Sequence, residues 1–377
     1  MSLSGEERLD WLQLFRSENV GPKTFRTLID RYGSAARALE RLPDLAKKGG
    51  KRAIKVASRQ SVRDEAQAVA DFGGSLIALP DSDYPNLLRA IDDPPPVIAA
   101  KGALHLLAQP MVAIVGARDA SAAARSFAHD LAHHLGTEGL GVVSGLARGV
   151  DRAAHVGALK SGTVAVLAGG LDKLYPRDNQ DLYDRIGTEG VLLTETAMGI
   201  TAQARHFPKR NRIVSGMAVG VVIVEATERS GSLITARLAR EQNREVMAVP
   251  GFPSEARARG PNALIRDGAT LVESAADVLE AIGPHMRKPF EEPPQDYRPG
   301  KDLPPEPADS ELDRFRPDLH AALGPTSIDR DTLARRLGCT SHILSVLLLE
   351  LELAGKIASS PGNRVSLVRT DTELPLE

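Results

Sequence analysis

The spacing of apolar residues along the chain changes near residue 76. Before it, apolar residues recur at helical spacing, as in Phe25, Leu28 and Ile29, which predicts amphipathic helices. After it, short runs that are apolar almost throughout alternate with amphipathic stretches of helix length. Such runs are typical of strands buried on both faces, and helices between them imply parallel connections. The pattern therefore predicts a small helical module followed by an α/β domain with a parallel, doubly wound sheet.

The strands of this sheet can be placed from the apolar runs. Six runs are expected to form the central strands, at 111–116, 140–144, 163–168, 191–194, 219–225 and 245–249. Two earlier apolar pieces, at 75–79 and 96–100, are expected to add strands to one edge. In an open parallel sheet the ligand crevice lies at the carboxyl ends of the strands.

The C-terminal part contains a linker and a second small domain. Eight prolines fall between Pro284 and Pro307 among charged residues, and proline continues neither a helix nor a central strand. Beyond them, three helical stretches and a two-stranded ending turned at 361–363 resemble a winged helix. The predicted domains are a SAM-like or helix-hairpin-helix-like module at 1–75, the α/β domain at 76–283, a Pro-rich linker at 284–310 and a winged helix at 311–370.

The roles of the two small domains stay open. Segment 19–25 resembles the tight turn of a helix-hairpin-helix, whose amides can meet a phosphate, but a plain helix connection fits it equally well. The expected recognition helix, 340–354, is rich in leucine and carries few basic side chains. Protein contact or a structural role is therefore as compatible with it as contact with DNA.

Composition narrows the classes of function. The 377 residues carry a formal net charge of only −2, so any nucleic-acid site must be a local patch. The single cysteine, Cys339, excludes an internal disulfide. His129 and His133 lack a carboxylate at ligand spacing, so we expect no metal, and no cofactor motif is complete. The polar start and the absence of an apolar run of bilayer length predict a cytoplasmic protein.

One local patch has the character of a nucleic-acid site. Residues 205–212 put four positive charges, one imidazole and the aromatic ring of Phe207 into what we predict to be a loop ahead of an apolar strand. Cations neutralise phosphates, an exposed ring stacks on a base, and Pro208 limits the freedom that is lost on binding. A solvated basic turn is the alternative interpretation of the same charges.

Four turns follow predicted strands and are expected to meet at one edge of the sheet, at 115–118, 144–151, 168–172 and 227–236. The first carries Arg118 but lacks the further glycines of a dinucleotide fingerprint. In the second, Asp151 is expected to cap the helix that follows. The adjacent glycines of the third suit either an anion or a turn without a ligand. The fourth opens a helix whose amides and hydroxyls would form a phosphate cradle.

In combination and in this order, the motifs resemble those of the bacterial DNA-processing protein A family, also called DprA or Smf, over nearly the whole chain. The motifs are Val115-Gly116-Ala117-Arg118, Ser144-Gly145 through Asp151, Gly169-Gly170-Leu171-Asp172 with Tyr175-Pro176, Phe207 through Arg212, Ser230-Gly231-Ser232 with Thr235-Ala236, Val249-Pro250-Gly251, and Gly260-Pro261-Asn262 with Leu264-Ile265 and Gly268-Ala269. Ala117 and Thr194 stand where serine is usual in the family, and both changes are small.

The resemblance implies an extended Rossmann-like domain that binds single-stranded DNA and has no enzymatic activity. It further implies that the protein protects incoming single strands in natural transformation, loads the recombinase RecA onto them, and forms a homodimer through this domain. Phe207 would be the stacking ring. The residues expected to bind DNA are Arg118, Ser144, Gly145, Arg148, Gly149, Gly169, Gly170, Phe207, Lys209, Arg210, Asn211, Arg212, Gly231, Ser232 and Thr235.

Two other functions are alternatives. A nucleotide-processing enzyme of the LOG-like phosphoribohydrolase type would need an acid or base over the sugar, for which Glu195 and Asp151 are candidates. The Pro-Gly-Gly-x-Gly-Thr turn of that group is missing, and Ser230-Gly231-Ser232 stands in its place. A transcriptional regulator acting through the winged helix is the weaker alternative, because the basic and aromatic cluster lies in the other domain.

Overall fold

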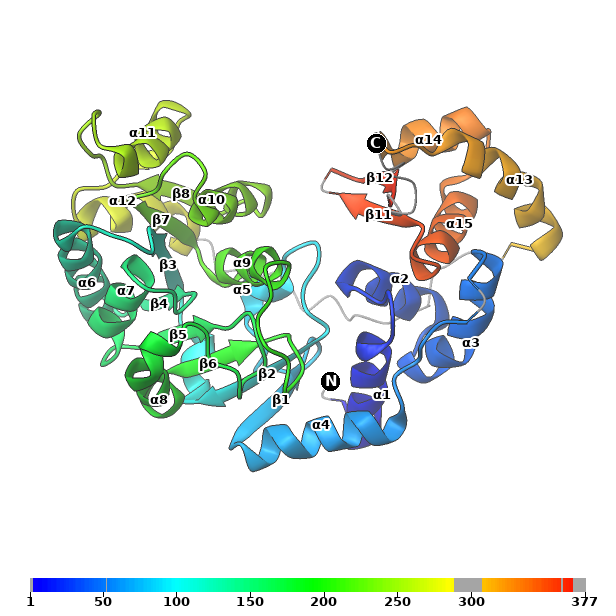
Figure 1. Cartoon of the computed structure of the whole chain (residues 1–377), viewed down its shortest axis with the longest axis horizontal. Coiled ribbons are helices and arrows are strands. Elements are labelled where there is room, and N and C mark those ends of the chain that lie inside the picture. Colours follow the sequence, from blue (N-terminus) through cyan, green and yellow to red (C-terminus); the bar gives the residue numbers. More distant parts are fainter. Residues whose placement is uncertain (1–2, 52, 288–306, 361, 369–377) are drawn as a thin grey trace, which may run out of the picture. The chain divides into compact units, whose positions relative to one another are not determined.

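The computed structural model describes residues 3–51, 53–287, 307–360 and 362–368 (Figure 1). Internal contacts divide the chain into two units. One is built on residues 63–295, and the other combines residues 4–62 with 296–377. The predicted linker at 284–310 falls largely outside the described residues, so its conformation stays a prediction.

The first unit is an α/β domain around a nine-stranded sheet in the order β1-β2-β6-β5-β4-β3-β7-β8-β9. All neighbours from β6 to β9 are parallel, whereas β1 and β2 pair antiparallel at one edge. The strands are β1 (Gly74–Ala78), β2 (Val97–Gly102), β3 (Met111–Gly116), β4 (Gly141–Ser144), β5 (Thr163–Val166), β6 (Val191–Thr194), β7 (Gly220–Val224), β8 (Glu245–Ala248) and β9 (Thr270–Leu271). The sequence therefore located every strand except the two-residue β9.

Helices cover both faces of this sheet. They are α4 (Arg59–Asp71), which leads into this unit, α5 (Asn86–Arg89), α6 (Ala122–Thr137), α7 (Val150–Ala158), α8 (Gln180–Glu189), α9 (His206–Met217), α10 (Gly231–Glu241), α11 (Arg259–Arg266) and α12 (Ala275–Arg287). Short 3₁₀ turns lie at Leu104–Ala108, Arg177–Asn179 and Ala256–Ala258. This is the doubly wound arrangement that the alternation of runs and amphipathic stretches predicts.

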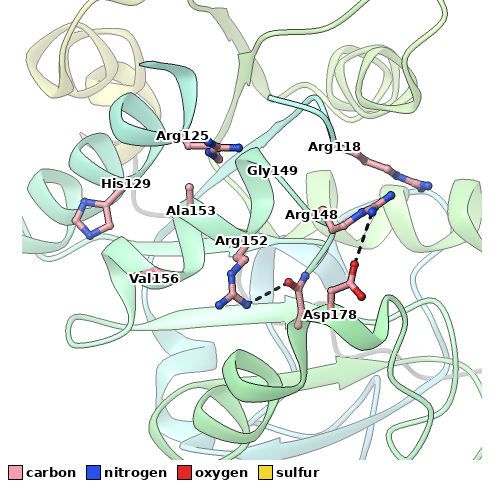
Figure 2. A pocket seen from close by; sticks show the side chains of 10 residues that line it. Arg118, Arg125, His129, Arg148, Gly149, Arg152, Ala153, Val156 and Asp178 are labelled. Carbon is pink, nitrogen blue, oxygen red and sulfur yellow. Dashed lines mark hydrogen bonds and ion pairs between the residues drawn. The ribbon is translucent and has the colours of Figure 1, made fainter. Parts of the chain in front are cut away.

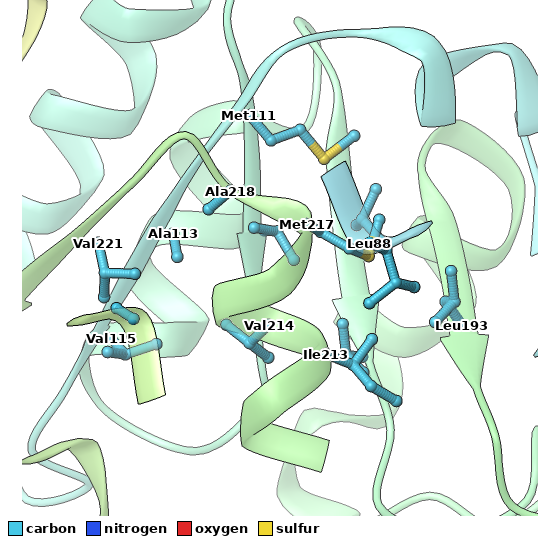
Figure 3. Close-up of a cluster of buried hydrophobic side chains, with 14 of the residues drawn as sticks. Leu88, Met111, Ala113, Val115, Leu193, Ile213, Val214, Met217, Ala218 and Val221 are labelled. Carbon is cyan, nitrogen blue, oxygen red and sulfur yellow. The ribbon is translucent and has the colours of Figure 1, made fainter. Parts of the chain in front are cut away.

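The two faces of the sheet have separate hydrophobic cores. Along β3, Val112 and Ile114 point into the core shared with α6, α7 and α12, and Ala113 and Val115 point into the core shared with α9 and α10. Alternation of this kind follows from the two-residue repeat of a strand. Figure 3 shows the second core, in which α9 lies against the sheet through side chains such as Ile213. Burying a side chain of this size contributes roughly 1.5–3 kcal/mol, so the position of α9 is fixed by packing.

The second unit joins the two ends of the chain. From the N-terminal end come α1 (Gly5–Arg16), α2 (Pro22–Tyr32) and α3 (Ala35–Lys48). From the C-terminal end come α13 (Asp309–Ala322), α14 (Arg330–Leu337), α15 (Ser341–Leu353) and a three-stranded sheet of β10 (Ile328–Asp329), β12 (Arg364–Leu367) and β11 (Ile357–Ser360). Three helices followed by a β-wing confirm the winged-helix prediction, to which the structure adds the short strand β10.

The N-terminal helices pack on α15, the expected recognition helix. Asn19 Nδ2 donates to the Leu353 carbonyl at 2.9 Å, and Thr24 Oγ1 donates to Glu352 at 3.3 Å. At Gly49, a Cβ atom would lie 2.0 Å from the Glu350 carbonyl oxygen, so the two segments are in direct backbone contact. Within α15 only Ser341 and Ser345 are exposed. The leucines of this helix thus form the interior of the second unit.

Candidate nucleic-acid interface

The basic segment at 205–212 is not a loop. Helix α9 begins at His206 with Arg205 as its N-cap, so most of the segment forms the first two turns of a helix. Pro208 is compatible with this because the first amides of a helix have no partner inside it. The expectation of a loop was therefore wrong, since proline is tolerated in the first turn of a helix. The helical repeat then sends the basic side chains in different directions.

Arg212 points inward and holds the end of β6. Its guanidinium forms an ion pair with Glu195, donates to the Asp93 carbonyl at 2.7 Å and lies 3.6 Å from the Asp93 carboxylate. Its side chain is only 8% exposed. A phosphate could reach it only by breaking this buried pair, so the geometry favours a positioning role for Arg212, and its expected DNA contact stays a prediction.

Arg210 is also buried, beneath the turn after β4. A Cβ atom at Gly145 would lie 1.1 Å from Arg210 Nη1, so this glycine makes room for the guanidinium. Burial lowers the pKa of Arg210, and the facing Asp151 carboxylate opposes that effect. The guanidinium carbon lies 5.9 Å from the centre of the Phe207 ring. Arg210 is thus buried close to the ring, which favours a positioning role, and its expected DNA contact stays a prediction.

Asp151 fills the turn at 144–151 with its own carboxylate. Its carboxylate accepts the amide of Gly145 at 3.1 Å and the amide of Ala147 at 3.3 Å. The expectation that Asp151 caps the helix that follows was wrong: the N-cap of α7 is Gly149, and Asp151, in the first turn of that helix, closes the preceding turn instead. Burial raises the pKa of Asp151, and the Arg210 charge and these amides act in the opposite direction. Because the carboxylate already occupies these amides, they are not available to a phosphate.

His155 belongs to the same buried layer. Burial, with a smaller contribution from the Arg210 charge, lowers its pKa to about 3. Its Nε2 accepts the Leu146 amide at 3.3 Å, which leaves the Nδ1 hydrogen facing Thr163 Oγ1 at 2.7 Å. The Thr163 hydroxyl in turn donates to the Val142 carbonyl at 3.0 Å. The neutral imidazole thus fixes the turn that supports Arg210.

Several residues that were expected to bind DNA at the strand ends are buried and are held by contacts within the protein. Ser144 is fully buried, and its hydroxyl donates to the Ile114 carbonyl at 2.7 Å. Gly169 and Gly170 lie under segment 197–202, where a Cβ at Gly170 would approach the Ala197 carbonyl to 2.5 Å. Thr235 and Ser232 are buried at the start of α10. These residues shape the strand ends without presenting a surface.

A smaller set of exposed residues lies at the strand ends around Phe207, which is itself only partly exposed. The guanidinium carbon of Arg118 lies 5.3 Å from the centre of the Phe207 ring. The ring of Tyr175, 51% exposed, lies edge-on to Phe207 at 5.7 Å. Lys209 is exposed on the next turn of α9, and Arg205 at its start. We name Arg118, Tyr175, Phe207 and Lys209 the ring surface.

Tyr175 was not among the expected site residues. The sequence offered one signal, a large aromatic residue in a turn at the strand ends, but nothing in its spacing links it to Phe207. Other expected contacts lie nearby on the same rim of the sheet. Gly231 is exposed with open space around it, and Asn211 Nδ2 donates to its carbonyl at 3.3 Å. Arg148 is exposed beside Gly149.

The described part of the chain has neither a candidate metal site nor a candidate membrane helix. Within it, no cluster of His, Cys, Asp and Glu side chains could hold a metal ion. Among the helices of that same part, none is long and apolar enough to cross a membrane.

One exposed and one partly exposed ring beside cations, at the strand ends of a Rossmann-like sheet, are typical of the class of proteins that bind nucleic acid by stacking and charge. Comparison with known proteins assigns the chain to a particular family within this class. It belongs to the family of DNA recombination-mediator protein A, whose model matches residues 75–283. A DprA-like N-terminal HHH domain matches residues 5–68, and a DprA winged helix domain matches residues 303–363.

Individual relatives agree with this assignment. The chain is 37% identical to Protein Smf of Escherichia coli over 297 residues, which cover 78% of each chain. It is 40% identical to DNA processing protein DprA of Bacillus subtilis over 229 residues, 60% of this chain and 77% of the relative. The crystal structure of DprA from Streptococcus pneumoniae superposes with a TM-score of 0.61 at 35% identity, covering 74% of this chain and 98% of the other.

A second solved structure bears on the site. DprA from Helicobacter pylori superposes with a TM-score of 0.52 at 28% identity, covering 56% of this chain and 96% of the other, and its study describes a single-stranded DNA binding mode. Membership of this family makes the chain a relative of recombination mediators, and it does not favour the LOG-like enzyme considered from the sequence.

Proposed function

We propose that this protein binds single-stranded DNA on the ring surface and acts as a recombination mediator. The observation that carries the proposal is the partly exposed Phe207 ring, flanked by the Arg118 guanidinium at 5.3 Å and by the exposed Tyr175 ring at 5.7 Å. The single-stranded DNA binding described for the Helicobacter pylori relative supports it.

Binding on such a surface follows from simple physical chemistry. A base stacks on an aromatic face with little regard to its identity, and each such contact is worth roughly 1–3 kcal/mol. Arg118 and Lys209 neutralise the flanking phosphates, so affinity falls as salt rises. Duplex DNA keeps its bases stacked inside the helix and cannot offer them to the rings, so the surface selects single strands.

The buried residues of the motifs have a different part in this proposal. Arg210, Asp151 and His155 form the layer that holds the turn after β4, and Arg212 holds Glu195 at the end of β6. We propose that they position the ring surface without touching DNA. The same contacts argue against an enzyme, because both candidate acids, Glu195 and Asp151, are already engaged by the chain.

The finer expectations from the family resemblance remain part of the proposal. They are loading of RecA onto the bound strand and formation of a homodimer through the α/β domain. Analytical ultracentrifugation tests the dimer. The rate at which RecA replaces single-strand-binding protein on an oligonucleotide, with and without this protein, tests loading.

Fluorescence anisotropy with a labelled oligothymidine and its duplex counterpart tests the site. We expect Arg118→Ala, Tyr175→Ala and Phe207→Ala each to weaken single-strand binding, the two ring variants by roughly 1–3 kcal/mol. Arg185→Ala removes the same charge from an exposed ion pair on α8 and should leave affinity unchanged. Equal binding by all four variants and the wild type would refute the site.

A further inference from the structure

A basic pocket of about 570 Å³ lies beside Arg118, between α6 and α7 (Figure 2). Besides Arg118, Arg148 and Gly149, it is lined by residues that the sequence did not associate with binding. These are Arg125, His129, Arg152, Ala153, Val156, Asp178 and Asn179. A volume of this size is in the range of small-molecule sites, and it accommodates a nucleotide unit.

Two close backbone contacts bring the lining together. A Cβ atom at Gly157 of α7 would lie 2.2 Å from the His129 carbonyl of α6, so the two helices touch there. Residues four apart share a helix face, which places Arg125 with His129 on α6 and Arg152 with Val156 on α7. At Gly149, with φ +75°, a Cβ would lie 2.2 Å from the Ala117 carbonyl. This second contact sets the turn that carries Arg148 against the turn that carries Arg118.

The charges of the pocket are poorly balanced by its own acids. Among the residues that the structure describes, neither Arg118 nor Arg125 has a carboxylate within ion-pair distance. Arg148 lies 3.6 Å from Asp178, and both side chains are more than 60% exposed, so this pair is weak and a phosphate can replace the carboxylate.

Arg152 differs, because Asp181 at 2.7 Å and Asn179 at 3.1 Å hold it in one orientation. Within the described part of the chain, the pocket thus presents two guanidinium groups without a carboxylate partner, of which Arg125 donates to the Ala120 carbonyl at 3.3 Å. Of the other two, Arg148 is weakly paired and Arg152 is fixed. Guanidinium groups suit phosphate oxygens because they donate two parallel hydrogen bonds.

The pocket also has a less polar side. Ala153 and Val156 of α7 lie on it, and Val156 is 40% exposed although it is large and apolar. The imidazole of His129, half exposed, completes this side from α6. Figure 2 shows the arginine side chains spread around Gly149, with Ala153 and Val156 beside them. A sugar or base can contact this side while its phosphate meets the arginines.

We propose that the pocket between α6 and α7 is a second binding subsite, which takes the nucleotides that follow those on the ring surface. Its phosphates meet Arg118, Arg125 and Arg148, and a sugar or base lies against His129 and Val156. The proposal rests on the proposed function, because Arg118 belongs to both places: it lines the pocket and lies 5.3 Å from the Phe207 ring. A strand bound at the rings therefore leads directly into the pocket.

The length of the oligonucleotide tests this extension. Anisotropy is measured with oligothymidines of about three and about twelve nucleotides, the longer within the site sizes usual for single-strand binding, for wild type, Arg125→Ala and the control Arg185→Ala. For the longer oligomer, Arg125→Ala should make the slope of log affinity against log salt shallower by about 0.7. If the variant and the wild type bind equally at 1 M salt, this difference in slope makes the variant bind about eightfold more weakly than the wild type at 50 mM salt. Binding of the short oligomer should not change.

Three outcomes would overturn the subsite. One is an unchanged slope for the longer oligomer, and another is an equal loss for both lengths. The third is Arg125-dependent binding of thymidine monophosphate with no effect of Arg125 on the longer oligomer, which would make the pocket a site for free nucleotides. If Tyr175→Ala and Phe207→Ala both left the two oligomers bound as tightly as before, the ring surface itself, and with it the proposed function, would fail.

Discussion

Replacing Gly145 by alanine adds one methyl group at the point where the turn after β4 crosses Arg210. Its Cβ would lie 1.1 Å from Arg210 Nη1 and 2.2 Å from the guanidinium carbon. The backbone of Gly145 does not have a positive φ, so the effect comes from this contact and not from backbone strain. The guanidinium must move away.

The size of the effect follows from what Arg210 contacts. Overpacking of a buried site costs about 1–3 kcal/mol. Displacement also moves the cation that faces Asp151, whose carboxyl group is fully buried, and it removes the support under the Phe207 ring. We therefore expect Gly145→Ala to lower the stability of the α/β unit by about 1–3 kcal/mol and to weaken single-strand binding as well.

A double-mutant cycle separates this explanation from a general defect. In the Arg210→Ala background the clash is absent, so Gly145→Ala should cost only a few tenths of a kcal/mol. Gly231→Ala is the matched control, because a Cβ there meets nothing within 4 Å. Stability is followed by thermal unfolding with circular dichroism. Fluorescence of Trp11, the only tryptophan, reports the other unit as an internal reference. Additive effects of Gly145→Ala and Arg210→Ala would refute the reasoning.

Three further perturbations have defined outcomes. Burial lowers the pKa of His155 to about 3, below the value of about 6.5 for an unfolded chain. Its contribution to stability is therefore present above pH 6.5 and is lost as pH falls, by about 1.4 kcal/mol per unit down to pH 3. Urea unfolding against pH should show this loss in the wild type but not in His155→Gln, and parallel curves would contradict it. Gly49→Ala places a Cβ 2.0 Å from the Glu350 carbonyl and should lower the Trp11 transition while DNA affinity stays the same; an unchanged transition would contradict the packing on α15. Arg212→Ala removes the buried ion pair with Glu195 and should lower stability by up to about 3–5 kcal/mol, whereas Lys209→Ala should leave stability unchanged and make the salt slope shallower by about 0.7. The reverse pattern would make Arg212 the phosphate contact.

The sheet could be predicted because its strands leave an unambiguous pattern. A strand buried on both faces must be apolar at every position, as in Val112, Ala113 and Ile114, and few other structures require such a run. Strand β9 escaped because two residues, Thr270 and Leu271, are too few to form a pattern. The packing of the N-terminal helices on α15 could not be predicted either, because both partners show apolar faces without indicating what covers them.

The basic motif shows where sequence reasoning about the site reaches its limit. Its positive charges suggest one function, yet a helix turns by about 100° per residue, so neighbouring side chains face different surroundings. Lys209 reaches solvent, whereas Arg210 and Arg212 point to Asp151 and Glu195, which come from other parts of the chain. A buried cation that is held by an acid of the same chain displaces no counterions when DNA binds. The positive charge that a phosphate can reach is therefore smaller than the total charge of the motif. Which arginines are paired with buried acids depends on the fold, because Asp151 and Glu195 come from other parts of the chain.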